Sequence, residues 1–176
     1  MAAGITYTPI ATQTLSSAAA SVTFSSISSA YTDLVLVISF TETSSATATN
    51  GYLTFNSDTY SSTTNYSATK LQGNGSAASS ARYSSQGAMY WDDDTTGSGF
   101  TTIRFNIMNY SNTTTYKTIL AREDNAGIAT IARVGLWRNT AAINAINLYG
   151  SDQAGAGSAD NFAAGTTITL YGIAAA

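Results

Sequence analysis

The stretch TDLVLVISF, residues 32–40, contains the longest apolar run of the chain, from Leu34 to Ile38. Three of those five residues are β-branched, and such side chains favour strands. A run without polar alternation is typical of a strand that is covered on both faces or lies at the centre of a sandwich. It is far shorter than the roughly 20 residues that a membrane-spanning helix needs. The run therefore predicts a central, buried β-strand.

On either side of this run the sequence alternates with a period of two. SVTFSSI, residues 21–27, places Val22 and Phe24 on one face and hydroxyl residues on the other. FTTIRFNIMNY, residues 100–110, alternates after one slip of phase, which a β-bulge would explain. Its predicted core residues are Phe100, Ile103, Phe105 and Ile107.

Similar segments recur along the chain and are separated by clusters of Gly, Asn and Ser. About ten candidate strands follow one another at the roughly 8–12-residue spacing of sandwiches and barrels. We therefore expect one all-β domain over residues 1–176, built as an antiparallel β-sandwich. The alanine-rich pieces SSAAASV and AAINAI leave a short helical turn as an alternative at those two places.

The only proline, Pro9, lies inside the first candidate strand. Proline cannot donate to a ladder, so residues 1–12 are expected to form an edge strand or an extended N-terminal arm. Residues 41–51 and 56–88 are rich in Ser, Thr, Asn and Gly, and they are predicted to be loops. We expect one or two weak strands within the second. Long loops in a compact domain are usually functional, which makes them candidate contact regions.

The composition narrows the possible functions. Only 10% of the 176 residues are charged and the formal net charge is −3, so nucleic acid and anionic membrane surfaces are poor partners. The chain has neither Cys nor His, which removes disulfides, thiolate metal sites and histidine-based catalytic triads. The first residues also lack the basic and apolar regions of a signal peptide. We expect a soluble protein without a cofactor, and any enzyme among the alternatives would depend on carboxylates.

The acidic residues cluster in MYWDDDTTGSGF, residues 89–100. An EF-hand loop that started at Asp92 would need a bidentate glutamate where Ile103 stands, so that motif fails. Asp92 and Asp94 remain weak candidate ligands for a hard cation, and the alternative is a hairpin corner between two strands. The two glutamates, Glu42 and Glu123, are the pair that a carboxylate-based hydrolase would use, and the sequence does not show whether they meet.

Six residues are candidates for an interface. Tyr60, Tyr66 and Tyr83 stand among small polar neighbours, where tyrosine offers a large contact area and a polar tip. The alternative for each is a half-exposed sheet position, which strands often fill with Tyr. Trp91 and Trp137 are assigned to the core or to a subunit interface. The list is Pro9, Tyr60, Tyr66, Tyr83, Trp91 and Trp137.

Three segments of the chain resemble small structural proteins of tailed bacteriophages, particularly those of marine and freshwater phages, including cyanophages. They are PIATQTLSSAAASVTFSSISSAYTDLVLVISF, then NYSATKLQGNGSAASSARY, then the closing GTTITLYGIAAA. The resemblance implies a jelly-roll-like sandwich, commonly trimeric, with no enzymatic activity and no cofactor. It also implies a place on the exterior of a virion that is assembled in the host cytoplasm.

Within that group the compact chain indicates a capsid decoration (cement) protein, which would bind the major capsid protein or another virion protein across capsomers. The alternative is a tail, baseplate or fibre component that recognises a host-surface glycan through exposed Tyr or Trp. The carboxylate-based hydrolase is the third hypothesis.

Overall fold

The computed structural model describes residues 6–41, 43, 49–61, 63–93, 101–125, 127–150 and 161–174, with only the backbone of 49, 50, 92 and 93. Twelve strands and no helix lie within these ranges, so the all-β prediction is confirmed and the alanine-rich segments are not helical. The strands are β1 (Tyr7–Thr14), β2 (Ser21–Phe24), β3 (Asp33–Phe40), β4 (Thr49–Phe55), β5 (Tyr66–Gly73), β6 (Ala78–Gln86), β7 (Met89–Asp93), β8 (Thr101–Ile107), β9 (Lys117–Asn125), β10 (Ala129–Trp137), β11 (Ile146–Tyr149) and β12 (Thr167–Ile173).

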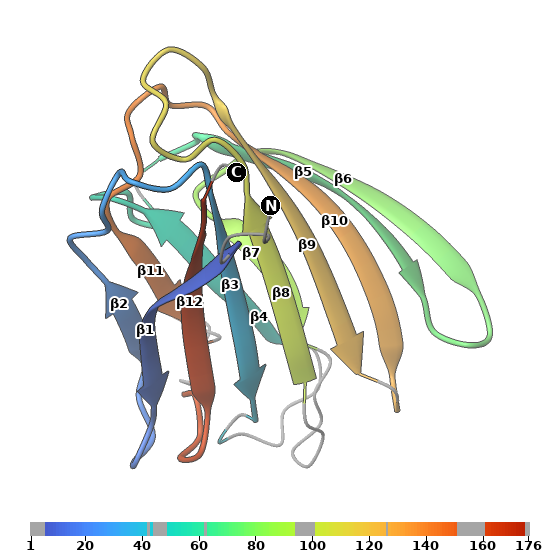
Figure 1. The fold of residues 1–176 in the computed structure, drawn as a ribbon. Coiled ribbons are helices and arrows are strands. Elements are labelled where there is room, and N and C mark those ends of the chain that lie inside the picture. Colours follow the sequence, from blue (N-terminus) through green and yellow to red (C-terminus); the bar gives the residue numbers. More distant parts are fainter. Residues whose placement is uncertain are drawn as a thin grey trace, which may run out of the picture.

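The strands form two antiparallel sheets (Figure 1). The larger sheet has eight strands in the order β1-β12-β3-β8-β9-β10-β5-β6, and the smaller has four in the order β2-β11-β4-β7. The chain passes repeatedly from one sheet to the other, for example from β1 to β2 and back to β3. Two hairpins interrupt this alternation, since β5–β6 and β9–β10 both add to the larger sheet beyond β8.

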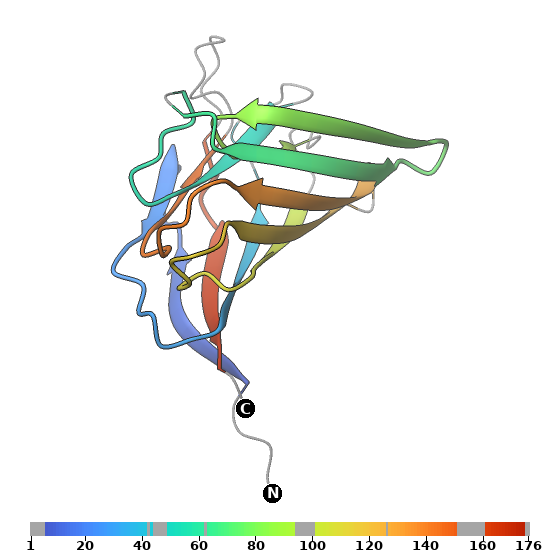
Figure 2. The ribbon, with the colours of Figure 1, turned by 90° about the horizontal axis from the view of Figure 1, so that it is seen from above.

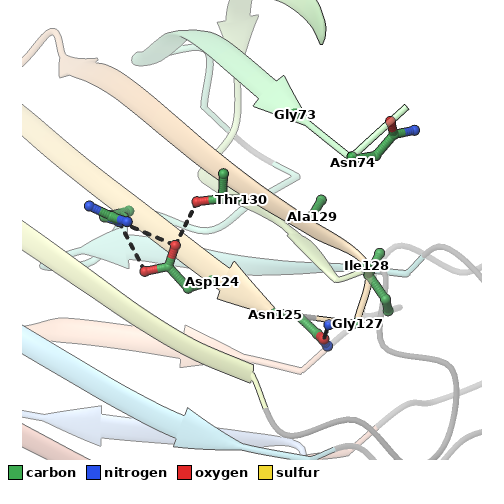
Figure 3. A pocket seen from close by; sticks show the side chains of 10 residues that line it. Gly73, Asn74, Asp124, Asn125, Gly127, Ile128, Ala129 and Thr130 are labelled. Atoms are coloured by element: carbon green, nitrogen blue, oxygen red, sulfur yellow. Dashed lines mark hydrogen bonds and ion pairs between the residues drawn. The ribbon is translucent and has the colours of Figure 1, made fainter. Parts of the chain in front are cut away.

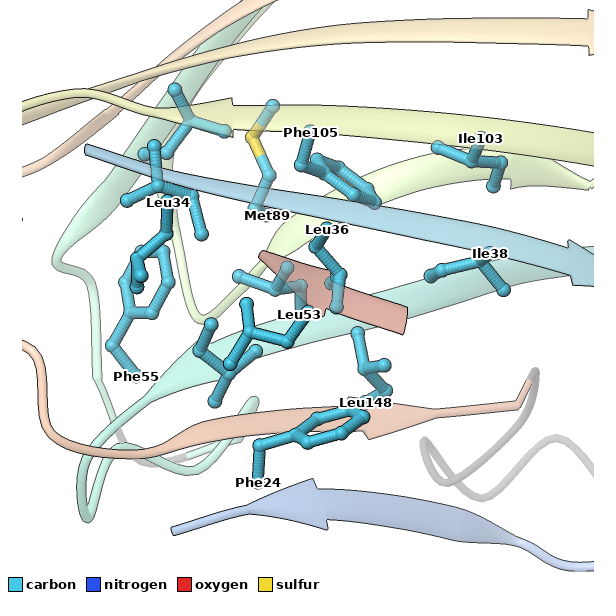
Figure 4. Close-up of a cluster of buried hydrophobic side chains, with 14 of the residues drawn as sticks. Phe24, Leu34, Leu36, Ile38, Leu53, Phe55, Met89, Ile103, Phe105 and Leu148 are labelled. Atoms are coloured by element: carbon cyan, nitrogen blue, oxygen red, sulfur yellow. The ribbon is translucent and has the colours of Figure 1, made fainter. Parts of the chain in front are cut away.

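The predicted central strand is β3, which lies between β12 and β8 in the larger sheet. Leu34, Leu36, Ile38 and Phe40 are fully buried on its inner face, and Val35 is 4% exposed on the opposite face. Burial on both faces is what the unbroken apolar run predicts. Figure 4 shows the inner-face side chains Leu34, Leu36 and Ile38 facing Leu53 and Phe55 of β4 and Leu148 of β11 across the core.

Strand β8 has the alternation that the sequence predicts. Ile103, Phe105 and Ile107 are fully buried, and Thr101 continues their face at 3% exposure. Phe100 lies outside the described residues. From Thr101 to Ile103 the pairing with β3 continues without a shift, so the predicted bulge is not found in the described part of that interval.

The loop prediction holds only in part. The one or two strands expected within residues 56–88 are present as β5 and β6, but they form a long hairpin, so the segment is not mainly a loop. In residues 41–51 strand β4 already begins at Thr49. The prediction of a hairpin corner in the acidic stretch is wrong. Strand β7 pairs with β4 in the smaller sheet, whereas β8 pairs with β3 and β9 in the larger one. The stretch therefore connects two sheets.

The two hairpins give the larger sheet a part that we call the wing, made of β9, β10, β5 and β6. Figure 2 shows the β5–β6 hairpin reaching beyond the smaller sheet, with its turn projecting from the rest of the molecule. Near the base of the wing, strand β7 packs against its inner face. A Cβ atom on Gly135 of β10 would lie 2.4 Å from Met89 Sδ, so any larger residue here would force the Met89 side chain to move.

The two edges of the larger sheet are β1 and β6. Strand β1 holds Pro9, and its register with β12 shifts between Pro9 and Ala11. This position agrees with the rule that places proline on edge strands.

Candidate functional site

Three large apolar side chains are exposed on the outer face of the wing. Leu71 of β5, Leu120 of β9 and Val134 of β10 are 60%, 44% and 46% exposed. Leu120 lies directly opposite Val134, and Leu71 lies opposite Ala132, the residue two before Val134 on β10. Exposed apolar side chains on neighbouring strands form a patch of the kind that marks interaction surfaces.

Cationic side chains surround this patch. Arg104 and Arg122 lie opposite each other on β8 and β9, and Arg82 lies opposite Thr69 on the hairpin. The Arg104 guanidinium donates to the hydroxyl of Tyr7 at 2.8 Å, and Arg122 Nε lies 3.0 Å from Asp124 Oδ2. These three residues are among the seven Lys and Arg residues of a chain with net charge −3, so this face is locally cationic.

A hollow of about 440 Å³ lies between the turns of the two hairpins (Figure 3). Gly73 and Asn74 line it from the β5–β6 side, and Asp124 and Thr130 line it from the β9–β10 side. Asp124 accepts a hydrogen bond of 2.6 Å from the Thr130 hydroxyl in addition to its pairing with Arg122. Asp124, the acidic residue of this hollow, is thus already bound by Arg122 and Thr130.

A second hollow of about 370 Å³ lies beside it, next to β6. Its lining includes Leu71, Gly73, Ala78 and Ala132. Small side chains at Gly73, Ala78 and Ala132 leave this space open beside the exposed Leu71.

The inner face of the wing holds three buried charges. Glu123 and Arg133 form an ion pair with Arg133 Nε 2.9 Å from Glu123 Oε1, and both side chains are 2% exposed or less. The ring of Tyr83 lies 6.0 Å from the Arg133 guanidinium carbon. Lys117 donates to the carbonyl oxygens of Thr115 and Thr140 at 2.8 and 3.2 Å. Burial lowers the pKa of Lys117.

This ion pair bears on the proposed catalytic pair of glutamates. The Glu123 carboxylate is bound by Arg133 through two nitrogens, which is the contact of a structural side chain. Glu42 lies outside the described residues. Glu123 is therefore committed to Arg133 within the part of the chain that the structure describes.

Four tyrosines gather on the outer face of the smaller sheet. Tyr90, Tyr52 and Tyr149 lie in one row across β7, β4 and β11. Tyr60 packs over this row, with ring centroids 5.5 Å from Tyr52 and 6.2 Å from Tyr149. Tyr52 is only 7% exposed, so the accessible aromatic area comes from the other three.

The structure separates the predicted interface residues into two groups. Pro9 is exposed on β1, and Tyr60 and Tyr83 are partly exposed. The prediction of a surface role is wrong for Tyr66, which is 1% exposed: the backbone N–H of Phe55 donates to its hydroxyl at 2.9 Å. Trp91 and Trp137 were assigned to the core or to a subunit interface. Both are fully buried in the core, so neither lies at the surface.

The structure does not test Asp92 and Asp94 as ligands of a cation. Asp94 lies outside the described residues, and only the backbone of Asp92 is described, at the end of β7. Among the described side chains, no three His, Cys, Asp or Glu residues come together as metal ligands would.

Sequence reasoning did not find the wing's outer face. Leu71 stands in a segment that was predicted to be mainly loop, and single apolar residues such as Leu71 and Val134 do not reveal which face the rest of the protein covers. The usable signal was the presence of Leu71 and Arg82 in a segment otherwise rich in small and polar residues.

The chain matches no known protein family, and no curated protein sequence is significantly similar to it. In the described residues, none of the elements is a helix that could cross a membrane.

Proposed function

We propose that this chain is a non-enzymatic structural protein of a tailed-phage particle, most specifically a capsid decoration protein with a jelly-roll domain. The connectivity is the observation that carries the proposal. When the hairpins β5–β6 and β9–β10 are set aside, the strand orders are β1-β12-β3-β8 and β2-β11-β4-β7. This alternation of eight strands between two four-stranded sheets supports a jelly roll, an architecture that occurs in viral capsid and lectin domains.

The two added hairpins support a role in attachment. They extend the sheet into a wing whose outer face combines the apolar residues Leu71, Leu120 and Val134 with cationic neighbours. A charge-poor surface also suits a protein present in many closely spaced copies, because like-charge repulsion between copies stays small. The proposed partner is the major capsid protein or another virion protein, and the proposed assembly is a homotrimer that lies across capsomers on the particle exterior.

The proposal is tested on the phage particle that encodes the chain. Quantitative mass spectrometry of purified particles should find the chain at a copy number close to that of the major capsid protein. A cryo-EM map should place its density over capsomer junctions. Absence from purified particles would contradict the structural role, and density only at the tail would contradict the decoration role.

The tyrosine cluster favours a second function, the recognition of a host-surface glycan by a tail component. Aromatic rings exposed on a rigid sheet offer apolar area and a polar tip to a sugar. The test is binding of the purified chain to polysaccharides from the host surface. Tyr60→Ala and Tyr149→Ala should each weaken binding, whereas Tyr7→Ala on the other sheet serves as the control. Equal binding by all three variants would remove this function.

A further inference from the structure

The four edge strands of the two sheets differ in how they are protected. Strand β2 has four residues, and β7 has five and ends in two aspartates. Strand β1 carries Pro9 and a bulge. Strand β6 has nine residues, no proline and one charged residue, Arg82. Short length, proline, charge and bulges are the devices that keep edges from pairing. Strand β6 is the longest of the four edges, and its charge and its register shift both lie toward its C-terminal half, so its first residues lack these devices.

The free hydrogen-bonding groups of β6 can be assigned from its turn. The Asn74 N–H donates to the Ala77 carbonyl at 3.2 Å and closes the hairpin. Hydrogen-bonded pairs then alternate along an antiparallel ladder, so the next bonded residue of β6 is Ser79, opposite Gln72. By the same alternation, Ala78, Ser80 and Arg82 direct their backbone N–H and C=O groups away from β5. All three residues are exposed.

The open part of the edge has a definite end. The register of β5 and β6 shifts between Tyr66 and Ala68, and Ser85 has a φ of 55°. The Ser84 carbonyl accepts a hydrogen bond from the Gln86 side chain at 3.0 Å. The unprotected edge therefore runs from Ala78 to Arg82.

We infer that this edge pairs with the same edge of a second copy of the chain, antiparallel and centred on Ser80. In this register Ser80 faces Ser80 of the partner, and Ala78 faces the partner's Arg82. Three residues from each chain then exchange about six main-chain hydrogen bonds. A register centred on Arg82 would instead place two arginines opposite each other, which is unfavourable. The chosen register avoids this repulsion.

The surface beside β6 fits the side chain that this register brings to it. Ala78 of β6 lies opposite Gly73 of β5. The partner's Arg82 would therefore extend across two positions that carry almost no side chain. The hollow of about 370 Å³ lined by Leu71, Gly73 and Ala78 lies there. It offers an apolar floor to the aliphatic part of an arginine while the guanidinium stays in water. A second copy therefore supplies a strand that pairs with the open edge and an arginine side chain that covers the hollow.

A single-cysteine scan tests the register, because the chain has no cysteine of its own. In the inferred pair the two Ser80 Cα atoms lie about 5.5 Å apart, within reach of a disulfide. The two Ala78 Cα atoms lie at least about 14 Å apart, beyond that reach. Under mild oxidation S80C should form covalent dimers, A78C should not, and a mixture of A78C with R82C should form mixed dimers. Equal cross-linking of S80C and A78C would overturn the inference.

A proline variant tests the same contact without a cross-link. The N–H of Ser80 points away from β5, so S80P removes no hydrogen bond inside the chain. Light scattering across a concentration series should show that S80P associates at least about tenfold more weakly, since both copies lose a donor. Unchanged thermal unfolding of S80P shows that the fold is intact, and unchanged association would contradict the pairing.

The pairing itself does not depend on the proposed function. Only its occurrence on a phage particle rests on that proposal. Each β6 edge is used once, so the contact joins chains in pairs and is separate from the proposed trimer interface. Both experiments use the purified chain. The pairing can therefore fail while the chain is still found on virions, and it can hold when the chain is not found there.

Discussion

The two halves of the eight-stranded sheet bury different kinds of side chain. In the half formed by β1, β12, β3 and β8, the inner face is apolar, and Leu36, Phe105 and Leu170 are fully buried there. In the wing, the buried residues include the charged Lys117 on β9 and the ion pair of Glu123 with Arg133. The first half lies against the smaller sheet and is stabilised by packing. The wing reaches beyond that sheet and depends more on specific polar contacts.

The largest expected effect comes from breaking the packed half. Phe105→Ala removes a fully buried ring that lies 5.8 Å from the Trp91 ring, measured between centroids. The free energy of unfolding should fall by about 3–5 kcal/mol, because the surrounding strands cannot close the cavity. Chemical denaturation measures this change. A loss below about 1 kcal/mol would mean that this half is not rigidly packed.

Breaking the buried charge pair of the wing should have the next largest effect. Glu123→Gln leaves the Arg133 charge buried without its carboxylate, and we expect a loss of about 3 kcal/mol. The double variant Glu123→Leu with Arg133→Met is the matched control. It should unfold within about 1 kcal/mol of the original chain, since well-packed apolar residues replace buried ion pairs at little cost. A double variant as unstable as the single one would show that the pair itself stabilises the wing.

The smallest effect is expected where the wing joins the smaller sheet. The Tyr66 hydroxyl accepts a hydrogen bond from the Phe55 N–H, so Tyr66→Phe should cost about 1 kcal/mol at neutral pH. Burial raises the pKa of Tyr66 above its ordinary value near 10. The folded state then holds this proton where the unfolded state releases it, so the stability that Tyr66 contributes falls as the pH rises above about 10.

The pH dependence gives this prediction its own control. Stability measured between about pH 9 and pH 11 should fall less steeply for Tyr66→Phe than for the original chain. Parallel slopes would contradict the assignment of the alkaline loss to Tyr66.

The sequence predicted the packed half of the molecule much better than the β5–β6 hairpin of the wing. The period of two and the unbroken run of β3 identify strands whose inner face is apolar, and β8 follows the same rule. In β5 and β6 both faces carry Ser, Thr, Lys or Gln, so the alternation that signals a strand is absent. Their pairing is set by the neighbouring strand β10, and a polar composition taken alone resembles a loop.

The prediction of Tyr66 as an interface residue was wrong for a related reason. Tyr66 and Tyr83 have similar sequence surroundings, yet Tyr66 is buried against Phe55, whereas Tyr83 is partly exposed and lies beside Arg133 on the inner face of the wing. Burial at such positions depends on which strands of the other sheet lie opposite. The error about residues 89–100 is of the same kind, because neighbours in the sequence were expected to pair and instead belong to different sheets.

The pairing of β1 with β12 has a consequence for how the protein is made. Tyr7 pairs with Ile173, and β12 separates β1 from β3 in the finished sheet. A growing chain therefore cannot place its first strand until residue 173 has left the ribosome. Contacts this distant in sequence slow folding and prolong the exposure of strands such as β3. We expect the newly made protein to need protection from aggregation until its last strand is inserted.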